Sequence, residues 1–203
     1  MPDAPLAVFV DRDTMVYERT YPHPIERVFE AVSTGEHLDV WMLPESRVER
    51  RLGGSCGFGW GGSADDPAAT RGTITEWSPP TAVQYTFVND SSMREGGSYM
   101  RFDLTAESET STTLRFTLHF LPSDDEEQPY PGGDLPAKGT AWRPGFVAGY
   151  HEMLDELGLY LLGKWTAEDR ARHLGGGDLA MDEQHNRWID VYRDHIRNAC
   201  PPS

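Results

Sequence analysis

Residues 143–165 read RPGFVAGYHEMLDELGLYLLGKW, and this stretch has the periodicity of a long helix. Apolar residues recur at helical spacing and form one stripe, made of Val147, Tyr150, Leu154, Leu157 and Leu161. The acidic residues lie away from that stripe, at Glu152, Asp155 and Glu156. A helix of this length can cross a β-sheet. We therefore expect its apolar stripe to cover the apolar face of one.

The sequence before this helix supplies strands for such a sheet. Alternation of apolar and polar residues is typical of strands with one solvent face, and it occurs at 15–21, 71–77, 82–88, 98–106 and 112–120. SRVERRL and SCGFGW are two further short runs, and the Gly53-Gly54 pair between them predicts a two-residue hairpin turn. Together these segments predict an antiparallel sheet.

The glycine-rich stretch RLGGSCGFGWGG also matches two catalytic motifs. It contains G-x-S-x-G around Ser55, as in a hydrolase nucleophile elbow, and G-x-G-x-x-G from Gly57, as in a dinucleotide-binding loop. Both motifs need a helix immediately after the glycines, to supply amide donors and a helix dipole. The residues at that position, GGSADDPAAT, are typical of a loop. We therefore favour a hairpin that carries glycines.

Two short helices are predicted after the first strand. PHPIERVFEAVST has Pro24 at a first helical position and apolar residues at helical spacing. Gly35 is expected to end this helix, and EHLDVWM predicts a second one with Leu38 and Trp41 on one side. The order of elements is thus strand, two short helices, six strands and a long helix.

Composition narrows the function classes. The chain has 203 residues, 38% of them hydrophobic, which is enough for one sizeable core. Its net charge of -15 disfavours nucleic acid and anionic membranes as partners. No apolar stretch has the length of a membrane span and no secretion signal is recognisable, so we expect a cytoplasmic protein. Cys56 and Cys200 are expected to be free thiols.

This order of elements and four motifs resemble the helix-grip fold of the START-like (SRPBCC) superfamily. The motifs are RTYPHPIERVFEAVSTGEHLDVWMLP, RLGG, RGTITEWSPPTAVQYTF and GFVAGYHEMLDEL, and within the superfamily they are similar to the C-terminal domain of activators of the heat-shock-protein-90 ATPase. The resemblance spans Met15 to Lys164. It implies an α+β fold in which about seven antiparallel strands curl around the long helix, with a cavity between them. Tyr150 stands where members of this group usually have Trp.

Large aromatic residues are frequent on the predicted inner faces. Those expected to point inward are Trp41, Phe58, Trp60, Tyr85, Phe87, Phe102, Phe116, Trp142, Phe146 and Tyr150. Rings with a few hydroxyl and indole donors among them suit a mostly apolar ligand that must be oriented. The alternative is that each ring simply fills the core. We expect this group, together with His151 beside it, to line a ligand cavity.

His151 is the best candidate for an acid or base, because its ordinary pKa lies near neutrality. Asp155, one helical turn further on, could tune its imidazole or form an ordinary surface pair. A third interpretation is structural, with His151 packed at the helix edge and bonded to a carbonyl. The seven histidines show no H-x-H or H-E-x-x-H spacing, so we assign no metal, cofactor or catalytic residue.

These patterns predict three regions: an arm at 1–14, the helix-grip domain at 15–165 and a helical extension at 166–203. Thr166 and Asp169 can begin a short helix in the extension. A later helix carries an apolar stripe, which either folds back on its own domain or docks on a second subunit of a homodimer. That stripe consists of Trp188, Ile189, Tyr192 and Ile196. The acidic segment 122–141 is expected to be either disordered or a lid.

The sequence therefore predicts a protein that binds a small hydrophobic or aromatic molecule in an internal cavity. Two alternatives stay open. One is an enzyme of the cyclase or dehydratase kind, which uses polar groups of the cavity and which the superfamily also includes. The other is a co-chaperone that binds a large protein partner, as the name of the similar group suggests.

Overall fold

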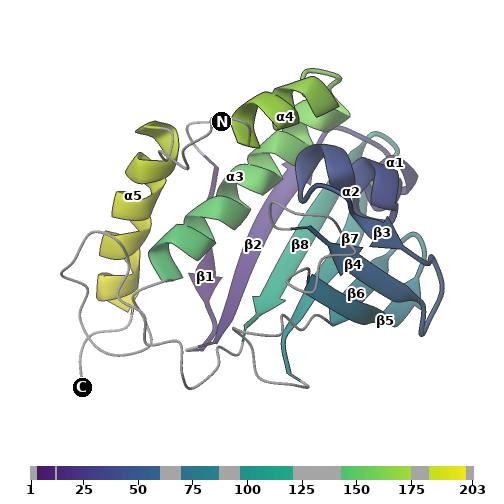
Figure 1. Cartoon of the computed structure of the whole chain (residues 1–203), viewed down its shortest axis with the longest axis horizontal. Helices are drawn as coiled ribbons and strands as arrows, with labels where there is room; N and C mark the ends of the chain where they lie inside the picture. The colour runs from purple at the N-terminus through teal and green to yellow at the C-terminus, as the bar shows by residue number, and fades with distance from the viewer. Residues whose placement is uncertain are drawn as a thin grey trace.

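A computed structural model describes residues 4–11, 13–59, 70–86, 97–120, 143–174 and 183–199. In these residues the chain forms one antiparallel sheet of eight strands and five helices (Figure 1). The longest helix, α3, runs across one face of the sheet, with the short helices α1 and α2 at one end of it. The predicted α+β helix-grip fold is confirmed, with eight strands where about seven were expected.

The strands follow the predicted segments closely. Their bounds are β1 Val8–Phe9, β2 Thr14–Tyr21, β3 Arg47–Val48, β4 Ser55–Phe58, β5 Thr70–Ser78, β6 Ala82–Thr86, β7 Tyr99–Ser108 and β8 Ser111–His119. The helices are α1 Ile25–Ser33, α2 Gly35–Trp41, α3 Arg143–Leu161, α4 Ala167–Leu174 and α5 Glu183–Ala199. Neighbouring strands in the order β1-β2-β8-β7-β6-β5-β4-β3 are all antiparallel.

The core lies between the sheet and α3. Alternate residues of the two central strands β7 and β8 are buried, and the register places Phe102 opposite Phe116 and Leu104 opposite Leu114. The apolar stripe predicted along α3 is buried on this side. Two tyrosine hydroxyls of β2 donate to carbonyls of α3, from Tyr17 to Val147 at 2.8 Å and from Tyr21 to Leu154 at 2.9 Å. These bonds fix the helix on the sheet.

Two predictions about turn glycines are wrong. Glu49 N–H bonds to Ser55 O at 2.9 Å, so the β3–β4 connection is longer than a two-residue hairpin. Of Gly53 and Gly54, only Gly53 has a positive φ, of 73°. Gly54 is required because a Cβ there would lie 2.0 Å from the carbonyl oxygen of Glu49. Gly35 does not end α1; the extended Thr34 ends it, and Gly35 begins α2. A Cβ at Gly35 would lie 2.6 Å from the carbonyl oxygen of Ser46. Both Gly35 and Gly54 are therefore places where two backbone segments come close together.

The catalytic interpretations of the glycine-rich stretch gain no support from the described residues. Ser55 is exposed and opens strand β4, whereas a nucleophile elbow places its serine at a sharp turn from a strand into a helix. Gly57 lies inside the same strand and pairs with Arg47 and Arg71. Residues 60–69, in which a following helix would have to begin, lie outside the described residues.

The arm and the extension both pack on the outer side of α3 and β2. Val8 and Phe9 of the expected arm form β1, paired with Val16 and Met15 of β2. The apolar stripe of α5 folds back on its own domain, and three of its four residues are buried: Trp188, Ile189 and Tyr192. The extension also covers two acidic side chains of α3, because Glu152 and Glu156 are only 8% and 6% exposed.

The start of α4 is fixed by a capping box. Asp169 N–H bonds to the Thr166 hydroxyl at 3.2 Å, and Thr166 N–H bonds to the Asp169 carboxylate at 3.0 Å. This is the helix start predicted from the sequence. Over the part of the chain that the structure describes, no helix combines the length and apolar character needed to cross a membrane.

Candidate functional site

Seven of the eleven residues predicted to line a cavity form one continuous aromatic cluster beneath α3. Ring centroids are separated by 5.7 Å (Phe58–Tyr85), 6.2 Å (Tyr85–Phe102), 6.4 Å (Trp41–Phe102), 4.7 Å (Phe102–Phe116), 5.4 Å (Phe116–Tyr150) and 5.0 Å (Tyr150–Phe146). Several of these pairs are edge-to-face, an arrangement favoured by aromatic quadrupoles. The cluster runs from β4 at one side of the sheet to the first turn of α3.

In the inner part of this cluster, the polar atoms of the aromatic side chains form hydrogen bonds within the protein. The Trp41 indole N–H donates to Ala31 O at 2.9 Å, and the Tyr85 hydroxyl donates to Val32 O at 2.9 Å. Both acceptors belong to α1, so these two bonds attach that helix to the aromatic core. Phe58 and Phe102 next to them are fully buried. These four residues therefore behave as core.

The outer part of the cluster differs at Tyr150. The side chain is only 3% exposed, and its ring packs between Phe116 and Phe146. Within the described residues its hydroxyl has no hydrogen-bond partner, and burial alone raises its pKa. Phe146 is half-buried and also contacts Phe120, with centroids 4.6 Å apart. We call Phe116, Phe120, Phe146 and Tyr150 the Tyr150 site.

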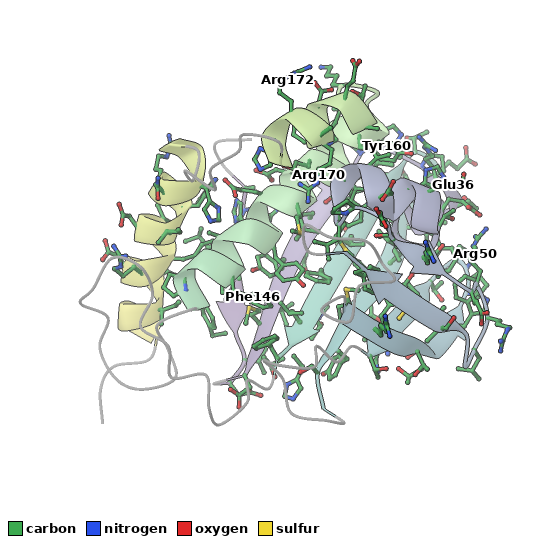
Figure 2. All side chains as sticks on the ribbon, in the orientation of Figure 1. Glu36, Arg50, Phe146, Tyr160, Arg170 and Arg172 are labelled. Carbon is green, nitrogen blue, oxygen red and sulfur yellow. The ribbon has the colours of Figure 1, made fainter. Side chains whose placement is uncertain are left out.

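This site lies at the end of the sheet where three connections of the chain begin. Thr86 pairs with Tyr99, and Tyr99 pairs with His119, so the ends of β6 and β8 lie together. The contact of Phe146 with Phe120 places the start of α3 beside them, and Figure 2 shows Phe146 at that end of the helix. The remaining three predicted aromatic residues are neighbours in sequence of strand or helix ends here but lie outside the described residues: Trp60, Phe87 and Trp142.

His151, the eleventh predicted residue, lies on a different side of α3. Its Nδ1 is 3.2 Å from an Arg19 guanidinium nitrogen and 2.7 Å from the Tyr192 hydroxyl. Arginine can only donate, so Nδ1 must be an acceptor. The Tyr192 hydroxyl accepts from Ala7 N–H at 3.0 Å and is free to donate to the same nitrogen. We therefore assign His151 as neutral, with its proton on Nε2.

The surroundings of His151 keep it neutral. The side chain is 0% exposed, and the Trp188 ring lies against it with centroids 4.0 Å apart. Burial, followed by the charge of Arg19, lowers the pKa of His151 to about 3. Asp155 is the nearby carboxylate, 3.9 Å from Nε2 and 3.6 Å from Arg19 Nε. We call Arg19, His151, Asp155, Trp188 and Tyr192 the His151 cluster.

A histidine in this state is a weak base at neutral pH, and its contacts are with the extension and β2. Of the interpretations open from the sequence, the structure places it nearest to the structural one, but its partners are side chains where a carbonyl was expected. Sequence reasoning did not identify Arg19 or Tyr192. The available signal was the position of Arg19, which shares the inward face of β2 with Met15, Tyr17 and Tyr21.

Two further polar contacts hold the extension to α3. Glu156 accepts a hydrogen bond from Arg170 at 2.8 Å, and Arg170 also donates to Met42 O. Burial raises the pKa of Glu156 to about 7, although the charge of Arg170 opposes the shift. Glu152 is 2.6 Å from His185 of α5. The polar side of α3 is thus closed by the chain's own helices.

Metal or thiol chemistry has no evident place among these residues. In the described ranges no three His, Cys, Asp or Glu side chains come together in a way that could hold a metal ion. Cys56 is a buried free thiol, and burial raises its pKa to about 12. Such a thiol is a poor nucleophile, because the thiolate is the reactive form.

Comparison with known proteins identifies relatives of the fold. Residues 22–161 match the family described as Activator of Hsp90 ATPase homolog 1-like protein. No curated protein matches the chain. CalU16 from Micromonospora echinospora has a TM-score of 0.61 at 14% identity, over 93% of this chain and 89% of that one. EF2215, a conserved protein of unknown function from Enterococcus faecalis, has a TM-score of 0.60 at 15% identity, over 95% and 91%.

Another solved structure covers a smaller share of this chain. PFC0360w, an HSP90 activator from Plasmodium falciparum, has a TM-score of 0.55 at 17% identity and covers 75% of this chain but 97% of its own. The two longer matches cannot reach their coverage without including part of residues 166–203. The family match ends at residue 161. Residues 166–203 thus lie beyond the family match, and part of them is included in the two longer structural matches.

Proposed function

The chain belongs to the family described as Activator of Hsp90 ATPase homolog 1-like protein, and from that premise we propose that it binds a small hydrophobic or aromatic molecule. The molecule lies in an internal cavity between the sheet and the first half of α3. The contacting residues are those of the Tyr150 site. The preferred ligand has an aromatic ring and one polar substituent.

The observation that carries this proposal is the Tyr150 hydroxyl. The Tyr150 ring is buried among aromatic rings, its hydroxyl has no partner in the described residues, and that hydroxyl is not sealed from solvent. A hydrogen bond to a ligand is worth about 0.5–1.5 kcal/mol net. A ligand that supplies a donor or an acceptor gains this energy at the hydroxyl, and the surrounding rings recognise its apolar part. The Trp41 and Tyr85 polar atoms are already bonded to α1, so they offer a ligand no such gain.

An enzyme of the cyclase or dehydratase kind has less support. Besides Tyr150, the buried side chains of α3 with strongly shifted pKa values are His151 and Glu156. Both contact the extension, on the side of the helix away from the aromatic cluster. Of the four described residues of the Tyr150 site, Tyr150 alone is ionisable, and its raised pKa makes it a poor base at neutral pH.

A co-chaperone role is the second candidate, favoured by the family description and by the HSP90 activator among the structural neighbours. In that case the purified chain retains a purified Hsp90 in a pull-down and raises its ATPase rate. An unchanged ATPase rate and no retention at micromolar concentrations would remove this candidate. Neither result depends on a small ligand.

The binding proposal is tested with two matched probes, 2-naphthol and naphthalene, which differ by one hydroxyl. The wild-type protein is expected to bind both, measured by isothermal titration and by thermal stabilisation. Tyr150→Phe is expected to weaken 2-naphthol about fivefold and to leave naphthalene unchanged, because it removes one hydrogen bond.

Tyr160→Phe is the matched control. Tyr160 lies at the opposite end of α3, where its hydroxyl contacts His37 (Figure 2). This substitution is expected to leave both affinities unchanged. Absence of binding of both probes to the wild type, or equal loss of both probes in Tyr150→Phe, would contradict the proposed site.

A further inference from the structure

The first half of α3, which carries Phe146 and Tyr150, is a weak helix by composition. Gly145 and Gly149 fall within its first two turns, and glycine lowers helix stability relative to alanine. Packing does not require a glycine at 149, because a Cβ there would have no atom within 4 Å. Gly158 in the second half differs, since a Cβ there would lie 3.4 Å from the Tyr21 ring. The first half therefore depends on its neighbours to stay helical.

Helix α5 is the main neighbour on the outer side of this half. Trp188 lies against the His151 ring, the Tyr192 hydroxyl bonds to His151, and His185 bonds to Glu152. We call His185, Trp188 and Tyr192 the α5 clasp. The second half of α3 is held separately, by the bond from Arg170 of α4 to Glu156.

The N-terminal segment is tied to the same clasp. Ala7 donates its N–H to the Tyr192 hydroxyl, and its carbonyl oxygen is 2.8 Å from His195 Nε2. The Phe9 ring contacts the His195 ring with centroids 5.9 Å apart. Figure 1 shows α5 and β1 next to each other on the outer side of α3. Detaching α5 therefore loosens the N-terminal segment as well.

The closed clasp leaves polar atoms incompletely satisfied. Arg19 Nε and His151 Nε2 are buried without a hydrogen-bond partner. The Asp155 carboxylate oxygens lie 3.6 Å and 3.9 Å from them, which is beyond hydrogen-bond distance. Water reaches both nitrogens when α5 moves away, so opening recovers hydration that the closed state lacks. This lowers the free-energy difference between closed and open states.

We infer that the α5 clasp controls the exchange of ligand at the Tyr150 site, an inference that rests on the proposed function. When the clasp detaches, the first half of α3 loses its support from α5 and keeps the Tyr17–Val147 hydrogen bond to β2, so Phe146 and Tyr150 separate from the sheet more readily. When the clasp closes, these rings are pressed onto Phe116 and Phe120. The extension is thus a gate for the site under α3, located on the other side of that helix.

The test measures probe dissociation by stopped-flow with 2-naphthol. Trp188→Ala is expected to raise the dissociation rate about tenfold, because it removes the ring that packs on His151. Gly149→Ala is expected to lower the rate about fivefold, because it strengthens the first half of α3. Tyr192→Phe, which removes only a hydroxyl, covers the case in which Trp188→Ala fails to fold, and is expected to raise the rate severalfold.

Val83→Ala is the control for general destabilisation. Val83 is buried in β6, away from α5, so this variant lowers stability and is expected to leave the dissociation rate unchanged. Unchanged rates in Trp188→Ala, Tyr192→Phe and Gly149→Ala, with normal wild-type binding, would overturn the gate and leave the proposed function intact. Equal acceleration of dissociation by Val83→Ala and Trp188→Ala would also overturn the gate and leave the proposed function intact.

Hydrogen exchange separates failure of the gate from failure of the proposed function. In Trp188→Ala the amides of 146–152 are expected to exchange faster, while those of 154–161 keep their wild-type rates. Equal acceleration along the whole helix contradicts a separately held first half, whether or not any probe binds. If the exchange pattern is as expected but no probe binds, the proposed function and the gating of ligand are both overturned. The result would then show only that α5 stabilises the first half of α3.

Discussion

Tyr150 and His151 are neighbours in sequence and both are buried in α3, but successive helical residues point about 100° apart, so the two side chains have different neighbours. His151 Nδ1 has two partners, Arg19 and Tyr192, whereas the Tyr150 hydroxyl has none among the described residues. Both side chains are buried, but access to their polar atoms differs. His151 Nε2 is sealed from solvent without a partner, whereas the Tyr150 hydroxyl is not sealed, so of these two polar groups the Tyr150 hydroxyl is the one open to a ligand.

The largest effect is expected at the ionic contact that closes the polar side of α3. Arg170→Met leaves Glu156 buried without its cation, and losing one partner of a buried pair costs about 3–5 kcal/mol. The double variant Glu156→Leu with Arg170→Met is expected to recover most of this loss. Urea unfolding measures both. A loss below about 1 kcal/mol in Arg170→Met would contradict a large contribution of this ion pair to holding the extension.

The pH dependence of stability is expected to show two opposing groups on this side of the helix. The pKa of His151 is lowered from 6.5 to about 3, so the unfolded chain binds the proton first as the pH falls. Its contribution to stability is fully present above pH 6.5 and is lost as the pH falls through the folded pKa. The slope is up to about 1.4 kcal/mol per pH unit.

Glu156 acts in the other direction. Its pKa is raised from 4.5 to about 7, so its contribution is fully present below pH 4.5 and is lost as the pH rises through 7. His151→Gln is therefore expected to flatten the acid side of the stability curve and to leave a decline from pH 4.5 to 7. A His151→Gln curve parallel to that of the wild type would contradict the assignment of a buried neutral histidine.

Gly149 offers a smaller test of the weak first half of α3. Gly149→Ala is expected to raise the free energy of unfolding by about 1 kcal/mol, since the added methyl group meets open space and alanine favours the helix. Arg187→Ala, at an exposed position of α5, is the comparison and is expected to change it by less than about 0.5 kcal/mol. A destabilised Gly149→Ala would show a crowded site.

The sequence sufficed for the elements that repeat a pattern. The long alternations of β7 and β8 and the apolar stripe of α3 are periodic, and periodicity locates each of them within a few residues. Strand β1 has only two residues, Val8 and Phe9, and cannot show a period. No turn motif between β1 and β2 indicates that the two strands pair. The prediction of β1 therefore requires the folded structure.

The sequence predicted which residues form the aromatic cluster. It did not predict which of them belong to the core and which to the Tyr150 site. Aromatic content indicated the cluster, yet whether a polar atom of Trp41 or Tyr150 has a partner depends on distances that no local pattern contains. The partners of His151 show the same limit, because Arg19 and Tyr192 lie 132 residues before it and 41 residues after it. Only the inward position of Arg19 in β2 was a hint available from the sequence.

The most direct measurement is the free energy of unfolding of Tyr150→Phe and Tyr192→Phe without ligand. Tyr150→Phe removes a phenolic oxygen of α3. Tyr192→Phe removes a phenolic oxygen of α5 that contacts His151 of α3. Tyr150→Phe is predicted to change the free energy of unfolding by less than about 0.5 kcal/mol, because its hydroxyl has no partner among the described residues and is not sealed from solvent. Tyr192→Phe is predicted to be less stable, because Ala7 N–H and His151 lose a partner. Equal destabilisation by both variants would contradict the account, since Tyr150 would then already be bonded within the protein.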